Sequence, residues 1–162
     1  MIQYYDIILI VSQNQTMRVS NCIFDVMETI HTIYTGNLRT EVKHVRSGVS
    51  TFMDAPTDNQ GKGESFSPSD MLAASLGSCM ATIMGIAGRT HEISIDGMEV
   101  RITKFMASDP RRVSGVKVEF DMPALNYSEK DRKILFNAAK TCPVALSLHP
   151  DINQEIIFNY KD

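Results

Sequence analysis

The chain has 162 residues, of which 43% are hydrophobic, enough to fill the core of one domain of ordinary size. Its 16 Lys and Arg residues are outnumbered by 19 Asp and Glu residues, so the chain lacks the positive field with which nucleic-acid-binding proteins attract phosphates. Three widely spaced cysteines exclude both the disulfide framework of a small secreted domain and a zinc site, and they favour a reducing compartment.

Residues 1–26 contain a strand-like apolar run followed by polar residues, and they do not continue into the periodic pattern that follows. We interpret them as an N-terminal extension of uncertain role, which could equally add an edge strand, and residues 27–162 as a single domain. The apolar run at residues 7–11 is too short to cross a bilayer and lacks the basic leader and cleavage site of a secretory signal. We therefore expect a cytoplasmic protein that does not enter a membrane.

The first predicted element is a β-hairpin. Alternating polarity and β-branched residues over residues 31–44 predict a strand, and Arg46-Ser47-Gly48 provides a turn into a second strand at residues 49–53. Residues 54–67 are rich in Pro, Gly, Asp, Asn and Ser, which predicts a long surface loop of the kind that often lies over a functional site.

A long helix follows this loop. Ser67 is placed to cap it, Pro68 takes the first helical position, and Asp70 adds an acid to the first turn. No charge occurs within residues 71–88 and small residues are frequent there, so we expect the helix to be packed closely by protein at the centre of the fold. Its predicted apolar face consists of Leu72, Leu76, Cys79, Ile83 and Ile86.

The second half of the chain predicts two strands, two helices and a last strand. Ser128 and Asp131, three residues later, form a capping box, and the helix that they start should end at Thr141 because Cys142 precedes Pro143. The order of all elements gives an α+β fold with mainly antiparallel pairing. The expected ranges are strands at 93–106 and 113–122, a short helix at 143–148 capped by Cys142, and a strand at 152–160.

Two of the cysteines are candidates for chemistry. Cys79 lies on the apolar face of the long helix, where a free cysteine is most often a small buried hydrophobe. Cys142 caps the short helix, so its sulfur faces unpaired backbone N–H groups, which favour the thiolate and lower the thiol pKa. The alternative for Cys142 is that it only begins the helix, because sulfur is a poor capping acceptor compared with Ser or Asp oxygen.

Around these cysteines the sequence resembles the OsmC/Ohr family of osmotically inducible and organic hydroperoxide resistance proteins. One motif runs from Ser67 to Cys79 (SPSDMLAASLGSC) and the second from Ala138 to Val144 (AAKTCPV), in the order and at the separation seen in the family. The resemblance covers about residues 28–160. Shorter matches are Tyr34-Thr35-Gly36, Arg46-Ser47-Gly48 and Asp54-Ala55-Pro56.

The resemblance implies an OsmC-like fold, an intertwined homodimer in which antiparallel sheets wrap around long central helices and the sites lie at the subunit interface. It also implies a peroxidase, in which Cys79 attacks a hydroperoxide and becomes a sulfenic acid, and Cys142 condenses with it to a disulfide. A dithiol such as dihydrolipoamide, free or on a lipoylated protein, would then restore both thiols. No metal or bound organic cofactor is required.

A thiol on an apolar helix needs a nearby cation in order to ionise. In the organic hydroperoxide branch of the family an arginine from the first hairpin supplies it, oriented by a glutamate in the first turn of the cysteine helix. Aligning the hairpin turns implies Arg46 for this role, with Arg39 as the competing candidate. The glutamate position holds Ser69 here, and the acid Asp70 stands one residue later, where it would orient the arginine or only favour the helix dipole.

Because Ser69 replaces the glutamate of the family pattern, a second function stays open. The chain would then be a non-catalytic OsmC-like dimer that binds a small apolar ligand or senses oxidants stoichiometrically with the same thiols. A cysteine hydrolase is a weaker alternative, since no histidine lies near either cysteine in the sequence. Three methionines on or beside the long helix, Met71, Met80 and Met84, are interpreted as core residues.

Overall fold

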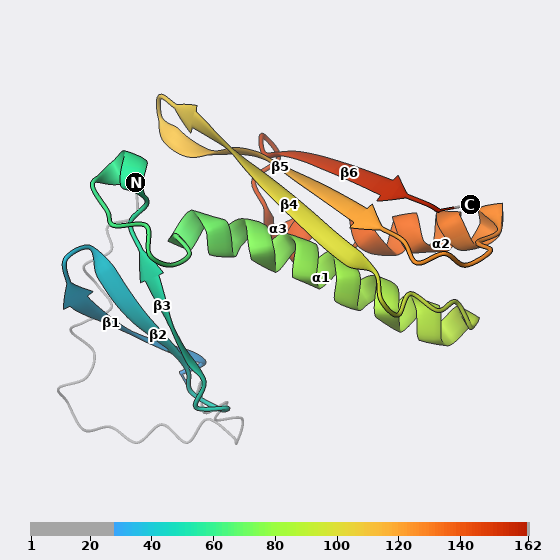
Figure 1. Cartoon of the computed structure of the whole chain (residues 1–162), viewed down its shortest axis with the longest axis horizontal. Helices are drawn as coiled ribbons and strands as arrows, with labels where there is room; N and C mark the ends of the chain where they lie inside the picture. Colours follow the sequence, from blue (N-terminus) through green and yellow to red (C-terminus); the bar gives the residue numbers. More distant parts are fainter. Residues whose placement is uncertain (1–27, 162) are drawn as a thin grey trace, which may run out of the picture.

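The computed structural model describes residues 28–161, and the predicted α+β class is confirmed. The predicted extension at residues 1–26 and Cys22 lie outside the described residues. The elements, in the chain order of Figure 1, are β1 Ile30–Gly36, β2 Arg39–His44, β3 Ser50–Asp54, the 3-10 turn η1 Thr57–Asn59, α1 Pro68–His91, β4 Glu99–Ser108, β5 Arg111–Asp121, α2 Glu129–Lys140, α3 Pro143–Ser147 and β6 Asn153–Asn159.

The first sheet is antiparallel, in the order β1-β2-β3. The predicted turn at residues 46–48 is confirmed as the β2–β3 connection, where Gly48 has a φ of 75°. The single strand predicted for residues 31–44 is wrong, because the chain reverses between β1 and β2. Asn37 and Leu38 take left-handed backbone conformations there, with φ values of 50° and 60°. Gly36 and Asn37 are common turn residues, but Leu38 rarely adopts this conformation and obscures the turn in the sequence.

Neither face of the first sheet is covered by the rest of residues 28–161. Ile33 is 51% exposed and the next residue, Tyr34, is 63% exposed. Consecutive strand residues point to opposite faces, so large apolar side chains stand in solvent on both sides of this sheet. In Figure 1 the sheet lies apart from the rest of the molecule, and residues 55–67 connect it to α1.

The start of α1 is set by the predicted cap. The Ser67 hydroxyl accepts a hydrogen bond from the Asp70 backbone N–H at 3.1 Å, and the Asp70 carboxylate accepts one from the Ser67 backbone N–H at 2.8 Å. This capping box satisfies two N–H groups that would have no helical partner. The predicted N-cap at Ser67 is therefore confirmed.

The buried face of α1 includes Ala73, Leu76, Met80 and Met84, which pack against α2, α3 and β4. The helix is long and apolar enough to cross a membrane by length and composition, but this buried stripe makes it the central helix of the core. Met80 and Met84 are core residues, as predicted. Ile86, predicted on the inner face, is instead 60% exposed, because it lies about 200° around the helix from Met84.

The second sheet has the order β4-β5-β6 and lies against α1, α2 and α3. β4 and β5 are antiparallel, whereas β5 and β6 are parallel, since α2 and α3 form the crossover that a parallel pair needs. On the inner face of β5, Val116, Val118 and Phe120 are fully or almost fully buried. β4 begins at Glu99 rather than at the predicted residue 93, because residues before it form a turn at Gly97, whose φ is 85°.

Both later helices begin at their predicted caps. Ser128 and Asp131 form the capping box of α2, and Cys142 caps α3.

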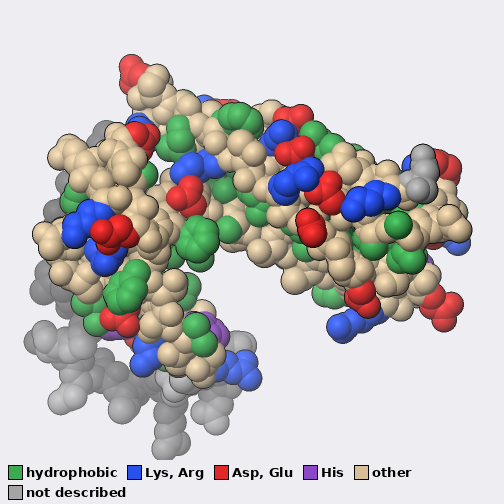
Figure 2. All heavy atoms as spheres, viewed as in Figure 1, with side chains coloured by type: hydrophobic (Ala, Val, Ile, Leu, Met, Phe, Trp, Pro, Cys, Tyr) green, Lys and Arg blue, Asp and Glu red, His purple; other side chains and the backbone are tan. Residues whose placement is uncertain are grey.

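On the face seen in Figure 2, Lys and Arg side chains lie among Asp and Glu side chains, and no broad basic patch forms there.

Candidate active site

Cys79 and Cys142, far apart in sequence, lie close together in the fold. Cys79 is near the middle of α1 and partly exposed, whereas Cys142 is fully buried at the start of α3. They meet because α3 packs against α1, and Cys79 lies close enough to affect the thiol pKa of Cys142. The site therefore contains an accessible thiol beside a buried one, both reduced.

The environment of Cys142 does not lower its thiol pKa. The sulfur accepts a hydrogen bond from the Ala145 backbone N–H at 3.3 Å, which stabilises the thiolate. Burial raises the pKa of Cys142 by more than this N–H lowers it, and the neighbouring Cys79 thiol raises it further. The prediction of a lowered Cys142 pKa is therefore wrong in its net direction, because loss of water outweighs the helix N-terminus.

Arg46 lies in the exposed turn between β2 and β3. β3 runs from this turn toward the connection with α1, so the turn is at the end of the first sheet that is remote from the start of α1 (Figure 1). Within residues 28–161, Arg46 forms no ion pair. One chain alone does not bring Arg46 to Cys79.

Arg39, at the start of β2, is held by two carboxylates. Its guanidinium donates to both oxygens of Asp54, at 2.6 and 2.8 Å, and to Glu64 at 2.7 Å. Its hydrogen bonds to Asp54 hold the pKa of that carboxyl below its usual range. Because Glu64 belongs to the segment between β3 and α1, Arg39 fixes this predicted loop to the first sheet.

Asp70 is paired with Lys104, a residue that belongs to neither cysteine motif. Lys104 of β4 donates to the Asp70 carboxylate at 2.7 Å and to the Ser69 hydroxyl at 2.8 Å. The sequence contains a sign of this pairing. Lys104 follows Val100 and Ile102 at every second position of β4, so its side chain points to the same face as theirs, and both of these residues pack on the core. A lysine at an inward-facing position needs an acidic partner, but the alternation does not identify which acid.

Replacing Lys104 by methionine should raise the pKa of Asp70. Burial by itself raises this pKa, but hydrogen bonds from Lys104 and Ser67 and the Lys104 charge together lower it to about 2, from an ordinary value of 3.8. A depressed carboxyl pKa stabilises the folded state above the unfolded pKa, and this contribution is lost as the pH falls from about 4 to about 2. The Lys104→Met protein should therefore lose less stability over this interval than the parent.

The measurement is the Asp70 carboxyl pKa by NMR, together with urea unfolding at several acidic pH values. Lys117→Met is the matched control, because Lys117 lies on the neighbouring strand and pairs with Glu119 at 2.9 Å instead. An Asp70 pKa that stayed near 2 in the Lys104→Met protein would contradict this assignment.

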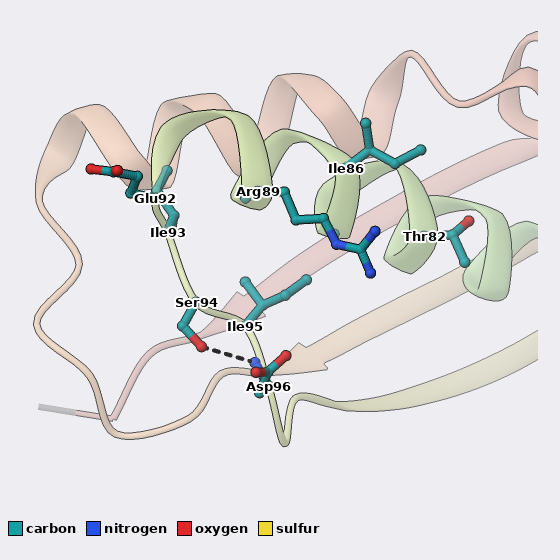
Figure 3. A pocket seen from close by; sticks show the side chains of 10 residues that line it. Thr82, Ile86, Arg89, Glu92, Ile93, Ser94, Ile95 and Asp96 are labelled. Atoms are coloured by element: carbon teal, nitrogen blue, oxygen red, sulfur yellow. Dashed lines mark hydrogen bonds between the residues drawn. The ribbon is translucent and has the colours of Figure 1, made fainter.

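A groove of about 650 Å³ runs along the C-terminal half of α1, between this helix and residues 92–96 (Figure 3). It begins one helical turn beyond Cys79, at Thr82, whose hydroxyl donates to the Cys79 carbonyl at 2.9 Å. Ile86 and Ile95 give the groove an apolar middle, and Arg89 extends over it from the last turns of the helix. The exposed side of α1 next to Cys79 thus adjoins a space large enough for a small organic molecule.

The family model for OsmC, described as OsmC-like protein, matches residues 61–156. This range includes both cysteine motifs, the whole of α1 and α3, and Lys104. No match is found among curated proteins.

Solved structures with the same fold include proteins named for stress and peroxide resistance. A protein from Psychrobacter arcticus 273-4, named for osmotic stress and detoxification, is 50% identical, with a TM-score of 0.80 over 85% of this chain and 99% of that one. The organic hydroperoxide resistance protein OsmC of Legionella pneumophila is 16% identical, with a TM-score of 0.65 over 82% and 98%. An organic hydroperoxide resistance protein of Elizabethkingia anophelis is 15% identical, with a TM-score of 0.66 over 85% and 99%.

Proposed function

Because this chain belongs to the OsmC family, we propose that it is a thiol-dependent peroxidase that reduces organic hydroperoxides, hydrogen peroxide or both. The observation that carries the proposal is the placement of the Cys79 thiol, partly exposed, beside the buried Cys142 thiol. Two structural relatives are named as organic hydroperoxide resistance proteins, which supports the choice of substrate class.

The reaction balances with these two thiols and one dithiol. The Cys79 thiolate attacks the outer peroxide oxygen, the O–O bond breaks, and the remaining alkoxide takes a proton to become the alcohol, or water when the substrate is hydrogen peroxide. The Cys142 thiolate then attacks the Cys79 sulfur, the S–O bond breaks, and the departing hydroxide takes a proton to become water. A dithiol such as dihydrolipoamide, free or on a lipoylated protein, reduces the disulfide by thiol–disulfide exchange and becomes oxidised itself.

The raised pKa of Cys142 supports this order of the two sulfurs. A protonated, buried thiol is a poor first nucleophile, whereas Cys79 is reachable from solvent and adjoins the groove that starts at Thr82. The organic part of a hydroperoxide would occupy this groove while its peroxide oxygen meets Cys79. Cys142 then serves as the resolving thiol.

Arg46 is our candidate for the cation that ionises Cys79, supplied by a second copy of the chain. It lies in an exposed turn with no ion pair among residues 28–161, so it is available to approach another subunit. Arg39 remains the competing candidate, but it would first have to leave Asp54 and Glu64. Asp70 would contribute by fixing the first turn of the cysteine helix through Lys104.

An intertwined homodimer would cover the apolar surface that residues 28–161 of one chain leave in solvent. A small three-stranded sheet needs something packed on it to be stable, and both faces of β1-β2-β3 expose large apolar side chains. The first sheet of one copy would lie on the central helix of the other, whose exposed face includes Ile86. Such a dimer, with thiols that must stay reduced between turnovers, fits a cytoplasmic protein.

The test is turnover of the full chain under excess dihydrolipoamide. The parent protein should consume many equivalents of cumene hydroperoxide or hydrogen peroxide per chain, and without dithiol the intact mass should fall by two hydrogens as the disulfide forms. A protein that consumed one equivalent and stopped with dithiol present would be a stoichiometric sensor, and the peroxidase proposal would be wrong.

A further inference from the structure

The inner face of β6 contains one polar residue. Ile156 and Phe158 of this strand pack on the core, and the strand alternation places Gln154 in the same inward-facing series. Its side-chain amide N–H donates to the Ala145 carbonyl of α3 at 3.0 Å. The carbonyl can only accept, so the direction of this hydrogen bond is fixed.

This contact is linked to Cys142 through one turn of backbone. The N–H of Ala145 donates to Cys142 Sγ at 3.3 Å, and the N–H of Leu146, which shares a peptide group with the Ala145 carbonyl, donates to the Cys142 carbonyl at 3.1 Å. Gln154, the Ala145–Leu146 peptide and Cys142 therefore form a continuous series of hydrogen bonds. Such a series strengthens each of its bonds by polarisation.

The short helix depends on support of this kind. α3 has five residues, too few for a helix to be stable by itself in water, and the Ala145 carbonyl is too near its C-terminus to have a partner within the helix. Within the described part of the chain, Gln154 provides the side-chain hydrogen bond that joins α3 to another element. The packing of α3 on α1 then brings Cys142 to Cys79.

We propose that Gln154 is a positioning residue for the disulfide-forming step, in that it fixes the first turn of α3 and thereby holds the Cys142 sulfur against Cys79. This inference rests on the proposed peroxidase function and adds a residue to it. Gln154 touches neither the peroxide nor Cys79, so it affects the attack of Cys142 on the sulfenic sulfur and leaves the earlier attack of Cys79 on the peroxide unchanged.

The test separates the two steps in the Gln154→Leu protein, which keeps the size of the side chain and loses the donor. Disulfide formation, followed by quenched-flow sampling and intact mass, should slow by about 10- to 100-fold, the cost of a reacting group displaced by about 1 Å. Sulfenic acid formation, measured by dimedone trapping in a Cys142→Ser background, should stay within twofold of its rate without the Gln154 substitution. Excess peroxide should convert more of the slowed protein to sulfinic acid.

Glu155→Leu is the matched control, because Glu155 is adjacent, exposed, and points to the opposite face of β6. It should leave both steps unchanged. An unchanged disulfide rate in the Gln154→Leu protein, or an equal loss in both steps, would overturn the assignment. If Gln154→Leu unfolds, Gln154→Glu at pH 7 gives a second variant that lacks the N–H donor. It should likewise slow disulfide formation and leave sulfenic acid formation unchanged.

Diamide distinguishes failure of this inference from failure of the proposed function. The Cys79 thiolate adds to the azo bond of diamide, and Cys142 then displaces the reduced hydrazine to form the same disulfide without any peroxide. If no hydroperoxide reacts but Gln154→Leu still slows diamide oxidation about 10-fold or more, the peroxidase is wrong and the positioning role stands. If peroxide turns over normally in this variant and diamide oxidation is unaffected, the positioning role is wrong and the peroxidase stands.

Discussion

Replacing Cys79 by serine should reduce peroxide consumption to the rate of buffer alone. A serine hydroxyl stays protonated at neutral pH and does not displace an alkoxide from a peroxide, whereas a thiolate does. Cys142 should not substitute for it, because Cys142 is fully buried and its pKa is raised. The measurement is the loss of cumene hydroperoxide with time under excess dihydrolipoamide, for the parent and the variant at equal concentration.

The matched control is Ser78→Ala, which changes the exposed neighbour of Cys79 on α1. It should retain the activity of the parent. Peroxide consumption at the parental rate by the Cys79→Ser protein would show that the nucleophile lies elsewhere and would end the present assignment.

Replacing Cys142 by serine should separate the first chemical step from recycling. Cys79 should still form one sulfenic acid per chain, but no intramolecular disulfide, so that turnover supported by dihydrolipoamide falls to a small fraction of the parental rate. Folding should be preserved, because serine is a better N-cap than cysteine for α3. Intact mass should therefore show the addition of one oxygen, followed by a second when peroxide is in excess.

The measurement for this variant is dimedone labelling of Cys79 beside a steady-state assay of the same sample. A stable sulfenic acid with greatly reduced turnover is the expected combination. Parental turnover with dihydrolipoamide would mean that the dithiol reduces the Cys79 sulfenic acid directly, and Cys142 would then have no resolving role.

Local signals predicted the helices of this protein well. Ser67, Ser128 and Cys142 were each identified as caps from the few residues around them, and each caps a helix in the structure. A cap depends on hydrogen bonds between residues three apart, so a short stretch of sequence contains all the information. The β1–β2 turn is harder to predict, because Gly36-Asn37 signals a turn but Leu38 takes a left-handed conformation that its side chain does not favour.

The faces and partners of residues were harder to predict. Ile86 fits a helical apolar stripe in the sequence, but α1 is turned so that Met80 and Met84 face the core and Ile86 faces solvent. Which stripe a helix buries depends on the elements around it, and an apolar helix with several possible stripes gives no local answer.

The polar residues around the cysteines illustrate the same limit. Strand alternation places Lys104 and Gln154 on inner faces, which is visible in the sequence, but their partners Asp70 and Ala145 are known only from the fold.

The pKa of Cys142 depends on the fold in a different way. The helix N-terminus could be predicted from sequence, whereas the burial that outweighs it depends on the packing of α3 against α1.

If Cys79 and Cys142 form the proposed disulfide, the complete burial of Cys142 decides which sulfur a reductant can attack. Because Cys79 is the partly exposed residue of the pair, a reductant would form its mixed disulfide with Cys79 and expel Cys142 as the leaving group. A leaving thiol of raised pKa departs slowly, which makes prolonged close approach by the reductant important. We therefore expect a dithiol on a long flexible arm to regenerate the pair faster than a redox site on the rigid surface of a folded protein.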